Sequence, residues 1–398
     1  MTLVSISIIF HNMRDTHLQF SAADESFMRR ALALADRAKG STFPNPAVGA
    51  VIVDAAGRIV GEGATGVYGG PHAERRALKQ AGAAAVGASM YVTLEPCSHF
   101  GRTPPCADAI IEAGIGAVTI AVKDPNPLVN GKGIKRLRSH GIAVRTGLLA
   151  AEAALINEDF LWSAANRRPW VALKLAMTLD GRIADRGGGS KWITSAAARL
   201  AVQEIRRRHG AIGVGAGTLI ADNPKLTARC GRKTYYPARI VFSSTENIPK
   251  DSYFMTRAGE ARTIIVVKNN KNKRKNGIDR RDAGRGWIDK NGGVEYWHTG
   301  SGDDAESIDT FLEMAFAEGI NSVLIEGGQR VASAFLENGF VNKLYLFYGN
   351  KIFGDGKDGF SFSRALTVDN SLILDGISYQ HFGEDFLATG YINGRRGG

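Results

Sequence analysis

Cysteine and long hydrophobic runs are both scarce in this chain of 398 residues. No apolar run approaches the roughly 20 residues that a helix needs to cross a bilayer, which excludes a membrane-spanning protein. The apolar segment 3–10 has neither a basic leader nor a clear cleavage site, so we expect no secretory signal. Of three cysteines, two lie in one motif described below, which leaves no pair for an intramolecular disulfide. These absences predict a protein of the reducing cytoplasm, with no membrane partner.

The composition is otherwise that of a globular protein, with 44% hydrophobic residues. At roughly 150 residues per domain, the length predicts two or three domains. The formal net charge of +11 indicates an anionic partner, which could be nucleic acid, a membrane surface or phosphorylated small molecules. Part of this charge lies in the basic run 268–281, which we interpret as a solvated surface loop; a nucleic-acid or partner contact is the alternative.

The strongest chemical signal comes from two short motifs. His72 and Glu74 form an H-x-E motif, and Cys97 follows a proline after an apolar run. A catalytic zinc needs three protein ligands and one open position for water, and His72, Cys97 and Cys106 supply one imidazole and two thiolates. Glu74 is then free to transfer protons, as in zinc-dependent nucleobase deaminases. Two alternatives remain: a closed structural zinc site with His99 as its fourth ligand, or an apolar pair of buried cysteines.

Helix geometry constrains where this zinc can lie. Two residues separated by one position point about 200° apart on a helix, so His72 and Glu74 cannot both face a metal beside it. The metal must then lie over the start of the helix, which Pro71 marks, since proline suits a first turn. The positive end of the helix would help to keep Cys97 and Cys106 ionised.

The loop 95–106 (EPCSHFGRTPPC) resembles the deaminase half of the bifunctional riboflavin-biosynthesis deaminase/reductases, whose thiolates also lie on a long loop. The resemblance implies a zinc-dependent pyrimidine deaminase in which Glu74 is the catalytic residue. Five further residues match substrate-contacting positions of that family, namely Asn45, His99, Arg102, Asp124 and Asn126. Taken singly, each is as common in a turn or a cap as in a ligand site.

Hydrophobic periodicity predicts an α/β fold in both halves of the chain. In the first half we expect strands at 48–53, 58–63, 90–94, 117–122 and 142–144, and helices at 21–40, 71–82, 106–114 and 133–140. Their alternation favours a three-layer domain with a largely covered sheet. In the second half we expect strands at 171–176, 211–214, 239–242, 263–267, 322–325 and 343–347, and helices at 195–207, 304–318 and 330–337. We therefore divide the chain into an N-terminal extension (1–20), a deaminase domain (21–147), a connecting helix (148–168) and a second domain (169–398).

Four stretches of the second half carry residues suited to chemistry. The stretch 325–328 (IEGG) ends a strand and opens a helix, where glycine N–H groups and the helix dipole could hold an anion. By itself such a turn more often has no ligand. The stretches 174–181 and 190–194 add a cation, hydroxyls and an indole ring, and 213–229 adds a glycine-rich turn and an arginine.

Together, the four stretches resemble the reductase half of the same family, which implies a dihydrofolate-reductase-like fold and NADPH as the cofactor. The resemblance assigns contacts with the ribose-phosphate substrate to Lys174, Ser190, Thr194, Arg206, Leu226, Arg229 and Glu326. It assigns cofactor contacts to Met177, Trp192, Asp222, Gly327 and Gly328.

The resemblance covers nearly all of the chain from Asp24 onward and implies two consecutive steps of riboflavin synthesis. The first removes an amine from a phosphoribosylaminopyrimidine by hydrolysis, and the second reduces its ribosyl chain to a ribityl chain. We expect phosphorylated small molecules as partners, no nucleic acid, and a homo-oligomer. One rival is a tRNA or nucleobase deaminase whose basic second half binds nucleic acid, but the run 268–281 has no aromatic residue for base stacking. A second rival, a non-catalytic zinc-stabilised binding protein, gives no reason for an unligated Glu74.

Overall fold

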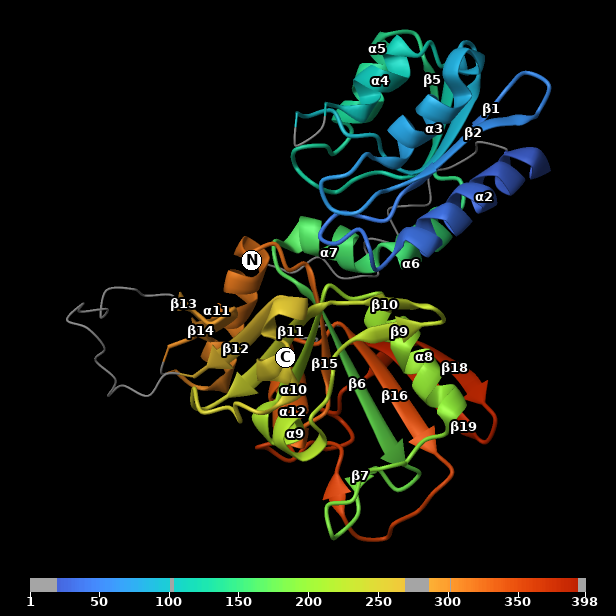
Figure 1. The fold of residues 1–398 in the computed structure, drawn as a ribbon. Helices are drawn as coiled ribbons and strands as arrows, with labels where there is room; N and C mark the ends of the chain where they lie inside the picture. The colour runs from blue at the N-terminus through green and yellow to red at the C-terminus, as the bar shows by residue number, and fades with distance from the viewer. Residues whose placement is uncertain (1–19, 101–103, 269–285, 301, 393–398) are drawn as a thin grey trace. The chain divides into compact units, whose positions relative to one another are not determined.

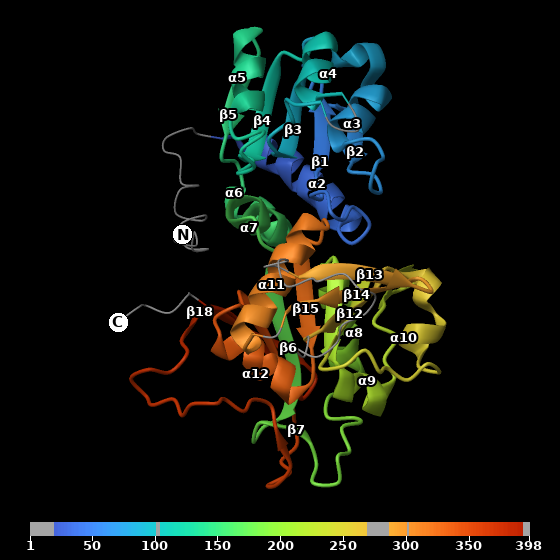
Figure 2. The same cartoon turned by 90° about the vertical axis from the view of Figure 1, so that its left-hand side faces the viewer.

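The computed structural model describes residues 20–100, 104–268, 286–300 and 302–392. The chain divides into two compact units, Met1–Arg167 and Arg168–Gly398, which Figures 1 and 2 show from two sides. Three predicted features lie outside the described residues: the N-terminal extension apart from Phe20, Arg102, and the basic run apart from Lys268. No helix within the described ranges is both long and apolar enough to span a membrane.

The first unit contains a five-stranded sheet in the order β2-β1-β3-β4-β5. Its strands are β1 (Gly49–Val53), β2 (Ile59–Ala64), β3 (Ser89–Leu94), β4 (Ala117–Val122) and β5 (Ala143–Thr146). β1 is antiparallel to both neighbours, whereas β3, β4 and β5 are parallel. The last residues of β3 and β4 and the first residues of β1 therefore meet at one edge of the sheet, and the zinc motif begins there.

Helices cover both faces of this sheet, so the predicted three layers are confirmed (Figures 1 and 2). The helices are α2 (Ala22–Ala38), α3 (Ala73–Ala81), α4 (Cys106–Glu112), α5 (Lys132–Ser139), α6 (Ala150–Ile156) and α7 (Glu158–Asn166), with a 3₁₀ turn η1 (Gly82–Ala85) after α3. α2 begins where the sequence predicts, because Ser21 and Asp24 form a capping box. α3, α4 and α5 lie on the other face from α2 and α6.

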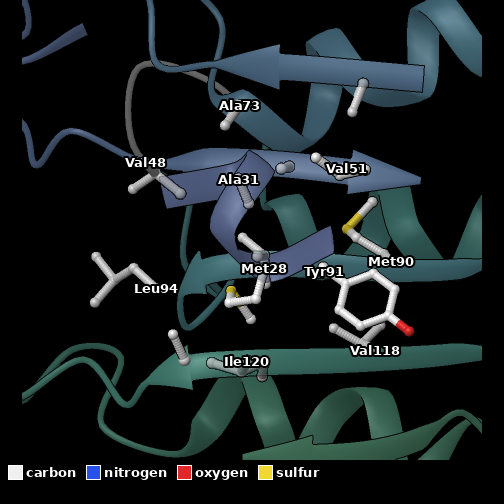
Figure 3. Packing of buried hydrophobic residues seen from close by; sticks show 14 of the residues in the cluster. Met28, Ala31, Val48, Val51, Ala73, Met90, Tyr91, Leu94, Val118 and Ile120 are labelled. Atoms are coloured by element: carbon white, nitrogen blue, oxygen red, sulfur yellow. The ribbon is translucent and has the colours of Figure 1, made fainter. Parts of the chain in front are cut away.

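The core of this unit lies on both faces of the sheet. On one face, Met28 and Ala31 of α2 pack against Val51, Tyr91 and other side chains of the sheet (Figure 3). These side chains are almost completely buried. Each fully buried side chain of this size contributes roughly 1.5–3 kcal/mol, so this packing fixes the sheet edge that carries the zinc motif.

The predicted connecting helix is wrong in one respect, because the structure has two helices there, α6 and α7, separated at Asn157. Both pack on the first unit: Ala153 and Leu161 belong to its core. Asp159 of α7 also forms a buried ion pair with Lys39 at the end of α2, with 2.5 Å between Nζ and Oδ1. The helical pattern of this segment gives no indication of such tertiary contacts, so the sequence alone predicts one continuous helix.

We expect Asp159→Ala to destabilise the first unit by roughly 3–5 kcal/mol, because the Lys39 ammonium would remain buried without its carboxylate. Amide hydrogen exchange of β1 and β3 measures the opening of this unit by itself. Glu152→Ala is the matched control: it breaks the exposed Arg29–Glu152 pair, 2.8 Å apart, and should cost less than about 1 kcal/mol. Equal effects of the two substitutions would contradict the assigned role of the buried pair.

The second unit contains a ten-stranded sheet in the order β13-β14-β12-β11-β8-β15-β6-β16-β19-β18. These strands are β6 (Trp170–Thr178), β8 (Ala211–Gly215), β11 (Ala238–Ser243), β12 (Thr263–Val267), β13 (Trp287–Asn291), β14 (Val294–His298), β15 (Ser322–Glu326), β16 (Lys343–Gly349), β18 (Leu374–Phe382) and β19 (Asp385–Ile392). The seven strands from β14 to β16 are parallel, whereas β13 and β19 run in the opposite direction. Two small ribbons pair β7 (Arg182–Ala184) with β17 (Lys357–Asp358), and β9 (Ala228–Cys230) with β10 (Lys233–Tyr235).

Helices cover both faces of the central strands of this sheet. They are α8 (Ala196–Arg207), α9 (Ala216–Asp222), α10 (Tyr253–Thr256), α11 (Asp304–Ala317) and α12 (Gln329–Glu337), with a 3₁₀ turn η2 (Ala258–Glu260). Alternate residues of β6 enter different clusters: Leu173 packs with α11 and α12, and Ala172 packs with α8. β6 is therefore buried on both sides, and the polar Lys174 within it needs a specific partner.

Candidate functional site

The three predicted zinc ligands lie together in the first unit. Among the described residues, these three form a group that could hold a metal ion, with their ligand atoms all within 4.8 Å of one another. His72 Nδ1 is 3.2 Å from the sulfur of Cys106 and 3.7 Å from that of Cys97. His72 precedes α3, Cys97 follows β3, and Cys106 is the first residue of α4. Three separate segments therefore place their donors around one point.

This donor set fits zinc. One imidazole and two thiolates are a known ligand set of catalytic zinc, and on one tetrahedral zinc a sulfur and a nitrogen lie about 3.6 Å apart. The observed distances from His72 to the two sulfurs are close to that value. His99, the fourth ligand of the closed alternative, is not a member of the group among the described residues. Three ligands leave one position for water.

The start of α3 differs from the prediction in one detail. The helix begins at Ala73 and His72 is its N-cap, with extended backbone angles, so Pro71 lies outside the helix. His72 can therefore face a metal that Glu74, inside the first turn, also faces. The helix start lies against Gly63 of β2, where a Cβ atom would be 2.1 Å from the Ala73 carbonyl oxygen. Glycine at this position permits the approach that places His72.

Burial and neighbouring hydrogen-bond donors shift the pKa values of the groups at this site. Burial raises the pKa of Glu74 to about 7, and the negative charge of Cys97 acts in the same direction. The pKa of the Cys97 thiol is lowered to about 4, because Cys106 and His72 hydrogen-bond to its sulfur. The Cys106 backbone N–H also donates to that sulfur, at 3.3 Å. The pKa of Cys106 is raised, because its thiol donates to Cys97 and is buried.

The predicted substrate residues of this unit, apart from Arg102 outside the described residues, lie on loops at the same sheet edge. Asn45 is half-buried in the loop before β1, and its N–H donates to the Thr42 carbonyl. His99 follows Cys97, and its Nδ1 is buried without a hydrogen-bond partner, as expected of a group that awaits a ligand. Asp124 and Asn126 follow β4; burial raises the pKa of Asp124 to about 7.

Glu95 is a residue of this site that the sequence did not identify. Its buried carboxylate accepts hydrogen bonds from the backbone N–H groups of Asp124, Gly131 and Ile134. Glu95 thus connects the end of β3, next to Cys97, to the loop that carries Asp124. A carboxylate directly after an apolar strand was the available signal, because a buried carboxylate requires several donors.

A second polar cluster lies in the second unit and contains three predicted residues. Arg206 of α8 donates two hydrogen bonds to the Glu326 carboxylate, at 2.7 and 2.6 Å, and a third to the Thr227 carbonyl at 3.1 Å. Lys174 of β6 is the register partner of Glu326 on β15. Its ammonium lies 5.7 Å from the centre of the Phe347 ring. The carboxylate at the end of β15 is therefore hydrogen-bonded by Arg206 of α8 and lies beside Lys174, in the middle of the adjacent parallel strand β6.

The pKa shifts of Glu326, Lys174 and Arg206 follow from their burial and from one another's charges. Burial opposes the ionisation of Glu326, but Arg206 and Lys174 outweigh it and hold the pKa of Glu326 below its ordinary value. Burial lowers the pKa of Lys174, and Glu326 opposes this effect. Burial also disfavours the charged form of Arg206, but the Glu326 carboxylate reverses the effect and the pKa is raised.

The remaining predicted substrate residues lie in two segments, one just before α8 and one around Thr227. Ser190 and Thr194 are half-buried in the loop before α8. Leu226 is buried, with a positive φ of 52°, and directly precedes Thr227. Arg229 is exposed on β9, and its backbone N–H donates to the Gln203 side chain at 3.0 Å.

The predicted cofactor residues divide into two groups. Trp192 is 60% exposed, and the Arg199 guanidinium lies 4.3 Å from its ring centre. Asp222 is exposed at the end of α9, 3.8 Å from the Lys191 ammonium. Met177 differs, because its side chain is buried in the core, so only its backbone could make the predicted contact.

The glycine pair after β15 has the backbone that its residue type permits. Gly327 and Gly328 both have positive φ, 77° and 81°, and Gly328 precedes α12. A Cβ atom on Gly328 would lie 3.1 Å from the Thr218 hydroxyl of α9. Thr218 therefore borders the turn, although the sequence pattern did not identify it; its place after the glycine-rich stretch 213–217 was the signal.

Two family models match this chain. The RibD C-terminal domain matches residues 169–388, and the cytidine and deoxycytidylate deaminase zinc-binding region matches residues 21–122. The riboflavin biosynthesis protein RibD of Aquifex aeolicus is 39% identical over 92% of this chain and 97% of its own length. The corresponding protein of Bacillus amyloliquefaciens is 43% identical over 83% and 85%.

Solved structures show the same similarity over both units. A RibD structure from Acinetobacter baumannii has a TM-score of 0.80 and 32% identity, covering 93% of this chain and 99% of the other. A diaminohydroxyphosphoribosylaminopyrimidine deaminase/5-amino-6-(5-phosphoribosylamino)uracil reductase from Thermotoga maritima has a TM-score of 0.79 and 37% identity, with the same coverage. The similarity therefore extends over both the group of His72, Cys97 and Cys106 and the pair of Arg206 and Glu326.

We expect Cys97→Ser to lose most of the zinc, because a hydroxyl replaces a thiolate in a set of three ligands. Zinc per chain, measured by metal analysis after dialysis, should be about one in the parent protein and far less in the variant. Cys230→Ser is the matched control, since Cys230 lies in the second unit and is also a free thiol. Full zinc retention by the Cys97 variant would contradict the ligand assignment.

Proposed function

Because the chain belongs to the riboflavin-biosynthesis deaminase/reductase family, we propose which of its residues carry out each of the two reactions. The family match, the two family models and the structures of relatives establish a zinc-dependent deaminase and an NADPH-dependent reductase in one chain. The observation that supports the residue assignment most directly is the grouping of His72, Cys97 and Cys106 within 4.8 Å, beside a buried Glu74.

In the deaminase unit we assign the zinc to His72, Cys97 and Cys106. When bound, zinc lowers the pKa of a coordinated water from 15.7 to about 7. The Glu74 carboxylate accepts a proton from the water that attacks the ring carbon, and delivers it to the adjacent ring nitrogen. It then takes the proton of the new hydroxyl group and transfers it to the amine. The new carbon–oxygen bond thus replaces the carbon–nitrogen bond, and ammonia leaves.

Substrate binding in this unit is assigned to the loops at the sheet edge. Asn45, His99, Arg102, Asp124 and Asn126 are proposed to hold the pyrimidine and its ribose phosphate, which the name of the Thermotoga relative indicates as the substrate. The unpartnered Nδ1 of His99 supports this assignment. A buried polar atom without a partner in the protein is available to hydrogen-bond a ligand.

In the reductase unit, hydride transfer needs a held cofactor, a held open-chain sugar and a nearby proton donor. We assign the sugar phosphate to the cluster of Lys174, Arg206 and Glu326 together with Ser190, Thr194, Leu226 and Arg229. We assign NADPH to Trp192, Asp222, the turn Gly327–Gly328 and the Met177 backbone. We assign to Lys174 the donation of a proton to the sugar oxygen, because it lies beside Glu326 in this cluster and burial lowers its pKa.

The expected partners are phosphorylated small molecules, which accounts for the positive net charge without nucleic acid. The described end of the basic run supports this view, because the Lys268 ammonium is 2.7 Å from the Asp304 carboxylate. We also propose a cytoplasmic location and a homo-oligomer.

We expect Trp192→Ala to weaken NADPH binding roughly tenfold, because the exposed indole offers the cofactor a flat apolar face. Fluorescence titration with NADPH measures the Kd. Trp287→Ala is the matched control in the same unit, where the indole stacks on His298 of β14. An unchanged Kd for the Trp192 variant would contradict the assigned cofactor side of the pocket.

A further inference from the structure

The break between α6 and α7 places a buried amide against the loop that leads into β1. Asn157 is 2% exposed. Its Nδ2 donates to the Ala47 carbonyl at 2.8 Å, and its Oδ1 accepts the Ala47 N–H at 2.9 Å. Both polar ends of one side chain are thus used on the backbone of a single residue 110 positions earlier. A continuous helix from α6 to α7 would not need this residue type.

The sheet itself explains why Ala47 needs this partner. β1 and β3 pair antiparallel with Ala50 opposite Val92, so the same register continued by three residues places Ala47 opposite Glu95. The chain leaves β1 there: the Glu95 N–H donates to the Val122 carbonyl of β4, and the next residue is a proline without an N–H. The Asn157 amide takes the place of the missing strand. Without it, two buried backbone groups would lack partners.

The loop held in this way is next to the deaminase site. Asn45 lies two residues before Ala47, and the antiparallel pairing puts the start of β1 beside the end of β3, where the chain continues to Cys97. The start of the loop is tied to the same segment, because Lys39 forms its buried ion pair with Asp159 of α7. The segment α6–α7 therefore holds both ends of the loop 39–47.

We propose that Asn157 is a positioning residue of the deaminase, which fixes the loop 39–47 and thereby the side chain of Asn45 at the substrate site. The inference rests on the proposed role of Asn45 in substrate binding. It also assigns the α6–α7 segment to the deaminase, although the zinc-binding family match ends at residue 122.

The test uses the full zinc-loaded chain and compares Asn157→Leu, which keeps the approximate volume but removes both hydrogen bonds, with the parent. Because two hydrogen bonds are lost, we expect the deaminase KM to rise roughly tenfold. The deaminase kcat, the zinc content and NADPH oxidation with the already deaminated substrate should stay near parent values. Asn166→Ala is the matched control on α7, where the amide donates to the Trp162 carbonyl of its own helix.

Amide hydrogen exchange gives a second readout that does not depend on activity. The Ala47 N–H should exchange faster in Asn157→Leu than in the parent and in Asn166→Ala. If Asn157→Leu does not fold, Asn157→Asp carries the same test: it can accept from the Ala47 N–H but sets an oxygen against the Ala47 carbonyl.

Two results would overturn the proposal. One is an unchanged KM together with unchanged exchange at Ala47. The other is an equal loss of zinc, deaminase and reductase activities in both Asn157 variants, which would indicate a merely structural role. A parent chain that does not deaminate the substrate would instead contradict the proposed function, and the exchange at Ala47 would still show whether Asn157 holds the loop.

Discussion

Glu74→Gln is expected to lower the kcat of deamination by roughly 10²- to 10⁴-fold, the range that general acid–base catalysis contributes. The amide has nearly the shape of the carboxylate but cannot accept a proton from water or deliver one to the ring. Zinc should still bind, because Glu74 is not among the three grouped ligands. Product formation, followed by mass with saturating substrate, measures the loss.

Two controls separate this effect from damage to the protein. Glu112→Gln changes an exposed carboxylate at the end of α4 and should leave deamination unchanged. The Glu74→Gln chain should still oxidise NADPH when it is given the already deaminated substrate, since the assigned reductase residues all lie in the other unit. Deamination by this variant at the parent rate would show that another group transfers the protons.

Glu326→Ala should abolish most reduction and leave deamination intact, so that the deaminated intermediate accumulates. The substitution removes the carboxylate that accepts two hydrogen bonds from Arg206 and faces Lys174. Two partly buried cations would then remain without a counter-charge, at a cost of roughly 3–5 kcal/mol in local stability. We expect kcat/KM for reduction to fall at least 100-fold, because a loss of roughly 3–5 kcal/mol at the pocket is large enough to cause such a fall.

Circular dichroism and the Kd for NADPH distinguish a lost contact from an unfolded pocket. Glu318→Ala is the matched control, because it breaks a half-exposed pair with Arg262, 2.7 Å apart, in the same unit. Glu326→Gln keeps the volume and should fall between the parent and the alanine variant. Reduction at the parent rate by folded Glu326→Ala would contradict the role of this cluster.

The sequence predicts the buried elements of both units well, because their apolar patterns are strong. β1, β3, β4, β8, β12 and β15 are buried at every or nearly every position, and their predicted ranges agree with the structure within one or two residues. The fold class and both cofactors are likewise confirmed by the family matches.

The edge strands of the second sheet, β13 and β18, escaped the prediction for a physical reason. β18 is exposed at most of its positions and has a polar sequence, so no periodicity marks it. It forms because β19 offers a row of unsatisfied backbone groups, which pair from Leu374 to Phe382. The hydrogen bonds of such a pairing come from backbone groups that every residue except proline carries, so an exposed strand leaves only a weak pattern in the sequence.

The sequence predicts the chemistry of the site better than the contacts that position its residues. The spacing of His72, Cys97 and Cys106 indicates zinc chemistry, but the roles of Glu95 and Asn157 depend on contacts between segments far apart in the chain. Each of these residues satisfies backbone groups that a sheet or loop has left unpaired. Such needs become visible only when the strands are in place.

The most direct test of the two-reaction account is the mass of the products that the parent chain forms from the diaminopyrimidine ribosylamine phosphate, with and without NADPH. Without NADPH, the account predicts that only the deaminated ribosyl compound accumulates. With NADPH, it predicts the ribityl compound, with one NADPH oxidised for each molecule formed. A reduced product that still carries the amine, or NADPH oxidation without any deaminated compound, would contradict it.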